Sequence, residues 1–343
     1  MLKCYPDRII QNVSLWNKFL PSITPYYALK CNPHPKIISE LSKLHINFEC
    51  AAISEIKKCV PTKKDIIYGH PHKSPFEIKK AKNWNIQKIV YDSLTQLKLI
   101  HKIYPNSLPI LRIQSCEELS KIKFNQKFGA SDEELDEIIY FHKKNNFNLH
   151  GISFHVGSKC YYPVQYINTM DKIHALINKY NLQINLIDIG GGFPSIDNNF
   201  TKTKFIEHVQ SIEKYVKKYK KYTYVGEPGR FIVDNALTLD VKVINKKIKY
   251  INDKKVFLYY INDGVYGSMN GVIFDGRQIE DTNKNTYDTI LYGQTCDSFD
   301  KIECKLREYE IGDTIRFDNF GAYSWSAASS FNGFERAKMK IEN

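Results

Sequence analysis

The chain has 343 residues, of which 43% are apolar and 25% are charged. This length corresponds to about two domains of ordinary size, and the balance of apolar and charged residues is that of a globular protein. The composition therefore excludes a collagen-like chain, a largely disordered chain and a small disulfide scaffold.

The net charge is strongly positive, +12 at pH 7, and only seven of the 49 basic residues are arginine. Such a surplus fits a nucleic-acid or anionic-surface partner, but a lysine-rich composition spread over solvated surfaces gives the same total. The lysines are scattered and form no dense basic run interleaved with aromatic residues. The second interpretation is favoured, and no nucleic-acid partner is expected.

The first residues contain no apolar segment of signal-peptide length, and no run of about 18 apolar residues occurs. We therefore expect a cytoplasmic protein (host cytoplasm, if the source is a virus) without a membrane partner. Eight irregularly spaced cysteines with no Cys-x-x-Cys pair favour free thiols and give no indication of a metal site.

The first two thirds of the chain alternate short apolar runs with segments of helical periodicity. The runs that predict strands are 26–30, 47–50, 66–68, 88–92, 109–114, 149–155, 185–189 and 222–226. The segments that predict helices include 35–44, 74–83, 131–145, 163–180 and 203–220. Eight strands alternating with helices predict an α/β fold, a (β/α)₈ barrel of the TIM type, over residues 5–234.

In residues 235–343 the alternation with helical segments ends, and strand-like runs such as LTLDVKVI, VFLYYIND, YDTILYG and TIRFDNF follow one another. They predict a mostly β C-terminal domain, a small barrel or sandwich, which residues 1–4 could join.

Polar residues follow the predicted strands at corresponding positions. Because the carboxyl ends of barrel strands meet at one mouth, we expect these side chains to surround an active site. They are Lys30, Glu49, His70, Asp92, Arg112, His155, the glycines at 190–192 and Glu227. IDIGGGFP and GEPGRF follow the last two strands, where an anion such as phosphate could be bound, although a tight turn explains three glycines equally well. Lys30 could form a Schiff base in such a mouth, or be one of many solvated lysines.

The flanks of these residues resemble the eukaryotic-type ornithine decarboxylases, which are pyridoxal-phosphate-dependent basic amino-acid decarboxylases of the alanine-racemase-like fold (fold type III). The matching segments run in family order from residue 26 to 334, and the resemblance includes short viral members, because the chain begins close to Lys30. The segments are YYALKCNP, FECAAISEI, LRIQ with KFGA, SFHVGSKC, LIDIGGGFP, GEPGRF, YYINDGVYGSMNGVIFD, YGQTCDSFD and DNFGAYSWSAASSFNGF.

The resemblance implies that Lys30 holds the cofactor through a Schiff base, that Glu227 pairs with the pyridine nitrogen and that His155 stacks on the ring. Glu49 stands where the family has aspartate, which keeps the charge and adds a methylene. Arg112 would lie beside the cofactor. Taken alone, His155 could be a core histidine, which is the usual role of a single histidine. For Arg112 a surface salt bridge is the weaker alternative. The implied phosphate contacts come from Ser158, the loop with Gly191 and Gly192, Gly229, Arg230 and Tyr323.

The resemblance also implies a head-to-tail homodimer with two shared active sites and an intersubunit ion pair between Lys127 and Asp300. Cys296 and Asp297 would enter from the second subunit, the thiol to protonate Cα and the carboxylate to bind the distal ammonium of the substrate. Taken alone, Cys296 could be a buried inert thiol.

Further substrate contacts are implied by the last segments. Asp275 would be the second acid on the distal amine, although alone it could be a turn residue before Gly276. Phe274, where the family usually has tyrosine, and Phe331 would line the pocket.

Asp297 argues against diaminopimelate, for which the family carries glutamate after the cysteine, and Asp275 argues against arginine, for which a viral relative carries glutamate. We therefore expect decarboxylation of L-ornithine to putrescine and carbon dioxide. Lysine remains an alternative substrate, because it is one methylene longer than ornithine and one methylene changes specificity only about 10–200-fold. Arginine is the other alternative substrate within the family. A non-catalytic regulatory homologue is the alternative from another functional class.

Overall fold

The computed structural model describes residues 1–197, 200–279 and 286–342. The chain divides into two compact units, one of Ile10–Ile232 and the other of Met1–Ile9 with Val233–Asn343. No helix in these described ranges is both long and apolar enough to span a membrane.

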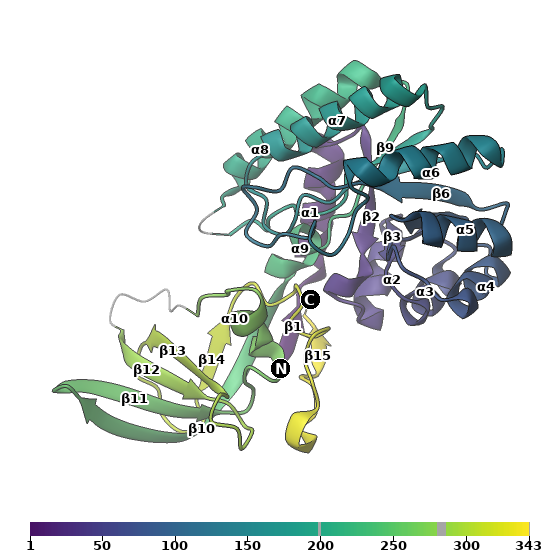
Figure 1. The fold of residues 1–343 in the computed structure, drawn as a ribbon. Coiled ribbons are helices and arrows are strands. Elements are labelled where there is room, and N and C mark those ends of the chain that lie inside the picture. Colours follow the sequence, from purple (N-terminus) through teal and green to yellow (C-terminus); the bar gives the residue numbers. More distant parts are fainter. Residues whose placement is uncertain (198–199, 280–285, 343) are drawn as a thin grey trace. The chain divides into compact units, whose positions relative to one another are not determined.

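The larger unit is built on a closed barrel of eight parallel strands, in which the last strand pairs with the first (Figure 1). The fold class predicted from the sequence is confirmed. The strands are β2 (Ile23–Ala28), β3 (Asn47–Cys50), β4 (Ile66–Tyr68), β5 (Lys88–Tyr91), β6 (Leu108–Arg112), β7 (Gly151–Ser153), β8 (Leu186–Asp188) and β9 (Thr223–Gly226).

Helices connect successive strands and cover the outside of this barrel. Predicted helical segments match α2 (Pro35–Lys43), α4 (Pro75–Asn83), α6 (Asp132–Lys144), α7 (Val164–Tyr180) and α8 (Lys202–Val216). The pattern did not single out α1 (Pro6–Phe19), α3 (Ile53–Cys59) and α5 (Leu94–Ile103), and a short α9 (Arg230–Val233) follows β9.

The start of α4 shows how local sequence sets these helix boundaries. The Ser74 hydroxyl accepts the Glu77 N–H, the Glu77 carboxylate accepts the Ser74 N–H, and Pro75 occupies the first helical turn. This capping box satisfies backbone donors that the helix leaves free. The loop before α4 therefore ends at a defined position.

The barrel interior is filled by apolar side chains that alternate with outward-facing ones along each strand. One cluster contains a residue from six of the eight strands: Tyr26, Ile67, Val90, Ile110, Leu186 and Val225. All are at most 4% exposed. Because the barrel is packed rather than open, ligands can reach only its ends, and the residues that follow the strands form one of them.

The smaller unit is a seven-stranded sheet rather than the small barrel or sandwich predicted from the sequence. The difference arises at β10, whose 15 residues carry a register shift between Val243 and Asn245. Its first part pairs with β1 and β14, and its second part pairs with β11, so the sheet branches. The strands are β1 (Leu2–Cys4), β10 (Leu237–Ile251), β11 (Lys254–Ile261), β12 (Tyr287–Tyr292), β13 (Lys301–Leu306), β14 (Thr314–Phe317) and β15 (Met339–Ile341).

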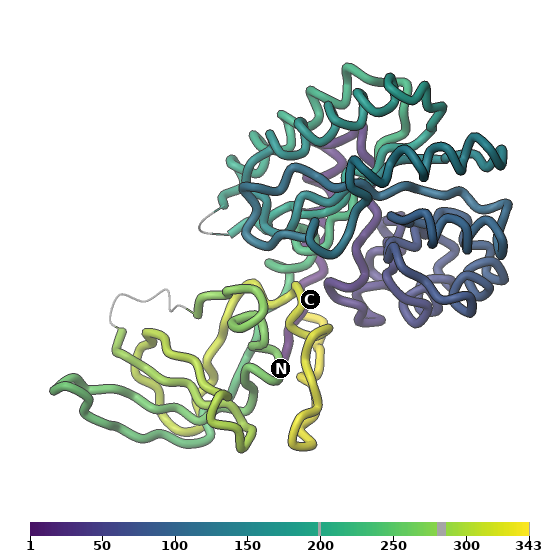
Figure 2. The backbone as a smooth tube through the Cα atoms, viewed as in Figure 1, coloured from purple at the N-terminus to yellow at the C-terminus, as the bar shows by residue number. Residues whose placement is uncertain are grey.

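The first and last strands of the chain lie side by side in this unit, as the backbone trace shows (Figure 2). β1 runs parallel to β15 and antiparallel to β10. The Leu2 and Cys4 side chains are fully buried, and Lys3 points the other way to Asp240, at 2.9 Å. The N-terminal residues are therefore part of the core of the smaller unit.

We expect Leu2→Ala to destabilise the smaller unit by about 2–5 kcal/mol, because it leaves a cavity between β10 and β15. The midpoint of thermal unfolding, measured by circular dichroism, should fall by several degrees. Ile10→Ala is the matched control, because Ile10 is 42% exposed and should leave the midpoint nearly unchanged. Equal midpoints for the two variants would contradict this role of β1.

Candidate active site

The polar residues predicted at the strand ends belong to one mouth of the barrel. Lys30 lies in a 3₁₀ turn (η1, Leu29–Cys31) directly after β2, and Glu49 belongs to the end of β3. Arg112 ends β6, while His155 and Glu227 follow β7 and β9. The parallel register of the strands places these residues at the same end of the barrel.

Two acids share this mouth with the Lys30 amine. Glu49 is only 3% exposed, and burial together with repulsion from Glu227 raises its pKa to about 8, although attraction to Lys30 opposes the shift. Burial raises the pKa of Glu227 well above its usual value, and repulsion from Asp188 adds to the effect. The electrostatics therefore favour a proton on one or more of these carboxyls at neutral pH.

Asp188 is a functional candidate that the sequence reasoning did not single out. It ends β8, is fully buried, and accepts the Gly190 N–H at 2.9 Å through Oδ1. Burial raises its pKa to about 6, whereas a hydrogen bond with Glu227 lowers it. The directions of the two pKa shifts favour Glu227 over Asp188 as the protonated member of this pair. An acid two residues before the three glycines was the available signal in the sequence.

His155 is held as a neutral imidazole in this mouth. Burial lowers its pKa well below the usual value, and the nearby charges of Lys30 and Arg112 lower it further. Its Nδ1 accepts the Gly157 N–H at 3.1 Å, which leaves the proton on Nε2. The ring contacts Phe124 edge to face, with centroids 4.8 Å apart. The imidazole is therefore fixed in both orientation and tautomer.

The glycine loop after β8 packs tightly against the loop after β7. Gly190 and Gly192 have φ angles of 66° and 100°, which favour glycine. A Cβ on Gly191 would lie 2.8 Å from the Glu227 carbonyl oxygen and 2.9 Å from His155 Nε2. Only backbone therefore fits at this position, so peptide groups can approach a ligand closely.

The other predicted phosphate-binding residues of the barrel unit lie in the adjoining loops. The Ser158 N–H donates to the Ile122 carbonyl at 3.0 Å, in the segment that also contains His155. Gly229 packs against Cys31, where an added Cβ would lie 2.9 Å from the Cys31 Cβ. Arg230 begins α9 and is only 6% exposed. These three positions follow β7 and β9, and Gly229 packs against the turn after β2.

Arg112 is half-buried, and no ion pair joins it to another residue in the described part of the chain. Its guanidinium lies 5.0 Å from the centre of the Phe128 ring. Burial lowers its pKa, while attraction to Glu227, Asp92 and Glu49 opposes that shift. Arg112 therefore supplies positive charge among the acids of the mouth.

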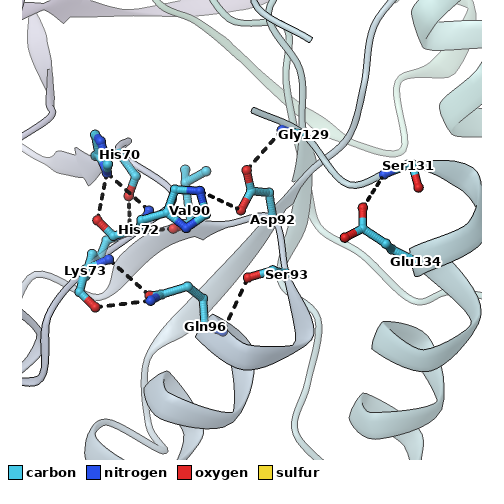
Figure 3. Close-up of polar contacts among 10 residues, drawn as sticks. All are labelled: His70, His72, Lys73, Val90, Asp92, Ser93, Gln96, Gly129, Ser131 and Glu134. Atoms are coloured by element: carbon cyan, nitrogen blue, oxygen red, sulfur yellow. Dashed lines mark hydrogen bonds and ion pairs between the residues drawn. The ribbon is translucent and has the colours of Figure 1, made fainter. Parts of the chain in front are cut away.

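Lys73, in the loop after β4, is a second lysine of the barrel mouth that the sequence reasoning missed. It is 3% exposed, and its Nζ donates to the carbonyls of His70 and Val90 (Figure 3). The same Nζ lies 4.5 Å from the centre of the Tyr68 ring. Burial lowers its pKa to about 7, although attraction to Asp92 opposes the shift. Among 42 lysines, nothing in the sequence marks this one as buried.

Asp92, which follows β5, contacts residues of the loops after β4 and β6 near Lys73 (Figure 3). Its Oδ2 accepts the Gly129 N–H at 3.0 Å, and its Oδ1 lies 3.6 Å from His72 Nε2. Gln96 holds the Lys73 backbone through hydrogen bonds of 3.1 and 3.2 Å. The residues after β4, β5 and β6 are thereby fixed to one another.

The remaining predicted residues lie in the smaller unit. Phe274 ends α10 (Gly271–Phe274) and is 72% exposed, with Asp275 directly after it. Tyr323 has a φ of 63° in the loop after β14. Phe331 is 44% exposed and stacks on Tyr266, with centroids 4.7 Å apart.

Cys296 and Asp297 lie between β12 and β13. The Cys296 thiol belongs to an exposed residue, so it is not a buried inert cysteine. Asp297 accepts the Phe299 N–H at 3.0 Å and the Tyr266 hydroxyl, and both hydrogen bonds lower its pKa. Asp297 is therefore a carboxylate at neutral pH.

Asp300 is only 2% exposed, and its carboxylate organises its own loop. Its oxygens accept the Val265 N–H at 2.9 Å and both the N–H and hydroxyl of Thr295, at 3.0 and 2.7 Å. Lys127, by contrast, is exposed beside Phe128. The ion pair between Lys127 and Asp300 of two subunits stays a prediction.

Comparison with known proteins gives the family. The model of the pyridoxal-dependent decarboxylases, pyridoxal binding domain, matches residues 6–234. The chain belongs to this family. The ornithine decarboxylase of Mus musculus is 33% identical over 354 residues, which cover 94% of this chain and 76% of the mouse protein.

Solved structures agree with this assignment. The arginine decarboxylase of Paramecium bursaria Chlorella virus matches with a TM-score of 0.90 at 29% identity, covering 99% of this chain and 95% of the viral one. The lysine/ornithine decarboxylase of Vibrio vulnificus complexed with cadaverine matches with a TM-score of 0.89 at 28% identity, covering 100% and 94%.

The residues of the mouth fit pyridoxal phosphate, the cofactor of the family. The site offers a lysine amine, a buried neutral imidazole and buried acids, and its glycine loop leaves backbone groups open to close approach. Glu49 Oε2 is buried and has no hydrogen-bond partner among the described residues, as expected where a ligand completes the site.

We expect Lys73→Met to destabilise the barrel by about 1–3 kcal/mol, because the His70 and Val90 carbonyls lose their donor inside the protein. The midpoint of thermal unfolding should fall by several degrees. Lys79→Met, on the exposed face of α4, is the matched control and should leave the midpoint almost unchanged. A midpoint for Lys73→Met equal to that of the control would show that the buried amine stabilises nothing.

The raised pKa of Glu49 predicts a pH dependence of stability. The folded chain keeps a proton on Glu49 up to about pH 8, whereas the unfolded chain releases it near the ordinary value of 4.5. The free energy of unfolding should therefore fall as the pH rises between these two values. Glu49→Gln cannot titrate in this range and therefore removes the contribution of residue 49 to the pH dependence of the free energy of unfolding.

Urea unfolding of the cofactor-free chain at pH 5 and pH 8 measures the effect. Wild type should lose more stability between these pH values than Glu49→Gln does. Glu137→Gln, on the exposed side of α6, is the control and should behave like wild type. If the free energy of unfolding changed equally with pH in wild type and Glu49→Gln, the raised pKa of Glu49 would be refuted.

Proposed function

We propose that this chain decarboxylates L-ornithine to putrescine and carbon dioxide, a step of polyamine biosynthesis. The observation that carries the proposal is the joint presence of Lys30, His155 and Glu227 at the barrel mouth and of two aspartates, Asp275 and Asp297, in the β unit. The similarity to the mouse ornithine decarboxylase supports the same substrate.

Bound pyridoxal phosphate supplies an electron sink for the electron pair left on Cα when the carboxylate departs. Lys30 would hold the cofactor covalently, and the amine of the substrate would then take the place of the Lys30 amine. Glu227 would pair with the ring nitrogen and keep a proton there, and its place after β9 at the barrel mouth supports this role. His155 would pack on the ring as a neutral group without adding charge.

The remaining barrel residues would bind and orient the cofactor. Backbone groups at Gly191, Gly192 and Gly229 would approach the phosphate closely, together with Ser158, Arg230 and Tyr323. Arg112 and Glu49 would set the charge beside Lys30. A buried guanidinium at Arg230 suits a phosphate because it presents several donors in a fixed plane.

Substrate recognition would rest on the carboxylates. Asp275 and Asp297 would bind the distal ammonium of the substrate, with Phe274 and Phe331 as apolar walls. The charge of Asp297 at neutral pH supports this role, because the distal group of ornithine is a cation. The Cys296 thiol would return a proton to Cα, and its exposure supports access.

We further propose a homodimer in which Cys296 and Asp297 of each subunit serve the site of the other, with Lys127 and Asp300 paired across the interface. The exposed aromatic side chains of Phe274, Phe299 and Phe331 support an interface, since aromatic residues are enriched in the interfaces between proteins. A cytoplasmic location is supported by eight free cysteines.

Two alternatives remain distinct from this proposal. Lysine or arginine could be the preferred substrate, as the names of the Vibrio vulnificus and chlorella virus structures indicate for those proteins. A non-catalytic regulatory homologue would be expected to have lost cofactor-binding residues, but Lys30, His155 and Glu227 are all present.

Release of carbon dioxide from ornithine, lysine, arginine and diaminopimelate, with pyridoxal phosphate added, tests the proposal. We expect kcat/KM for ornithine to exceed each other value at least tenfold, and Asp275→Ala to raise KM for ornithine strongly. Lys30→Ala is the control and should abolish release. A tenfold preference for lysine or arginine would overturn the substrate assignment, and no release from any substrate would favour the regulatory homologue.

A further inference from the structure

Gly69 directly follows β4 and lies beside Glu49 of the neighbouring strand. Glu49 pairs in register with Ile67, and the Gly69 N–H donates to the Cys50 carbonyl at 2.9 Å. These backbone contacts place residue 69 against the Glu49 side chain. An added Cβ at Gly69 would overlap Glu49 Oε1 and lie 2.7 Å from Cδ and 2.9 Å from Cγ.

The need for glycine at this position comes from space rather than from backbone conformation. Gly69 is not among the glycines with positive φ, so an alanine could adopt its backbone angles. The three heavy atoms nearest to the added Cβ all belong to Glu49. An alanine would therefore conflict chiefly with one side chain, and that side chain is flexible enough to move.

Movement of Glu49 would matter because of its surroundings. The residue is 3% exposed and lies within the electrostatic influence of Lys30, Glu227 and Arg112. In a buried site, small changes in the distance between charges have large effects, since little water screens them. A shift of the Glu49 carboxyl changes its distance from the Lys30 amine. Because little water can enter to screen this change, the shift alters the electrostatic environment of Lys30.

We propose that Gly69 is a positioning residue for the cofactor site: its missing side chain provides the space that holds the Glu49 carboxyl beside Lys30, and the two residues act as a coupled pair. A glutamate at position 49 requires glycine at position 69, whereas an aspartate, one methylene shorter, tolerates alanine. The inference rests on the cofactor-site role proposed above for Glu49.

A double-mutant cycle on the full-length protein tests the coupling. The variants are Gly69→Ala, Glu49→Asp and their combination, with Glu49→Ala and Gly69→Ala/Glu49→Ala as the matched control pair. Pyridoxal phosphate is titrated into each cofactor-free protein, and its dissociation constant is measured by absorbance. The pH midpoint of the visible absorption of the bound cofactor is recorded as well, because a purely structural role would leave it unchanged.

We expect Gly69→Ala to weaken cofactor binding by about 10-fold in the wild-type background, within the range of couplings between residues in contact. It should also shift the pH midpoint. With Asp at position 49, the same substitution should change affinity by less than about threefold, and with Ala at position 49 it should have no effect, because no carboxyl remains to be displaced.

Other outcomes overturn the inference. Equal losses of affinity from Gly69→Ala in all three backgrounds would show that Gly69 acts without Glu49, and no loss in the wild-type background would show that the space is not needed. Coupling seen only in the thermal unfolding of the cofactor-free variants would assign the pair to packing alone.

Failure of the proposed function gives a different result. If wild type bound no pyridoxal phosphate, the proposed function would be wrong and the role of Gly69 in a cofactor site would be overturned with it. If wild type bound the cofactor normally and the cycle showed no coupling, only the inference about Gly69 would fail.

Discussion

The site depends on burying several charged groups together at one end of the barrel. A buried charge is costly unless an opposite charge or a hydrogen bond accompanies it. Here Glu49 and Glu227 lie within the influence of Lys30 and Arg112, and repulsion between Asp188 and Glu227 raises the pKa of Glu227 further. Each group thus alters the protonation of the others, and the mouth behaves as one coupled system rather than as separate residues.

The barrel makes this arrangement possible because its core needs none of these residues. Apolar side chains such as Ile67 and Val90 fill the interior, so the strand ends can carry polar groups with little loss of packing. The loops must then be held rigidly. Lys73 and Asp92 do this by joining the loops after β4, β5 and β6 through backbone groups, which places a second buried amine close to the acids of the mouth.

The positive net charge has no direct part in this site, which depends on a local balance of charges. The scarcity of arginine is more informative, because two of the seven, Arg112 and Arg230, lie at strand ends of the barrel. A guanidinium stays charged in a buried site and presents several donors in one plane, which a lysine does not. The lysines are mostly on solvated surfaces, and Lys73 is an exception that only its burial reveals.

The sequence by itself determined the barrel, the mostly β second unit and the polar residues at the strand ends, because these depend on periodicity and on order along the chain. It did not determine the three unpredicted helices around the barrel; α3, for example, has only seven residues, too few to establish a period. The branching of the sheet at β10, the buried amine of Lys73, the mutual influence of Asp188 and Glu227, and the space that Gly69 gives Glu49 were decided by the tertiary structure. Each arises where segments distant in sequence meet, and burial and distance at such contacts leave no local pattern in the chain.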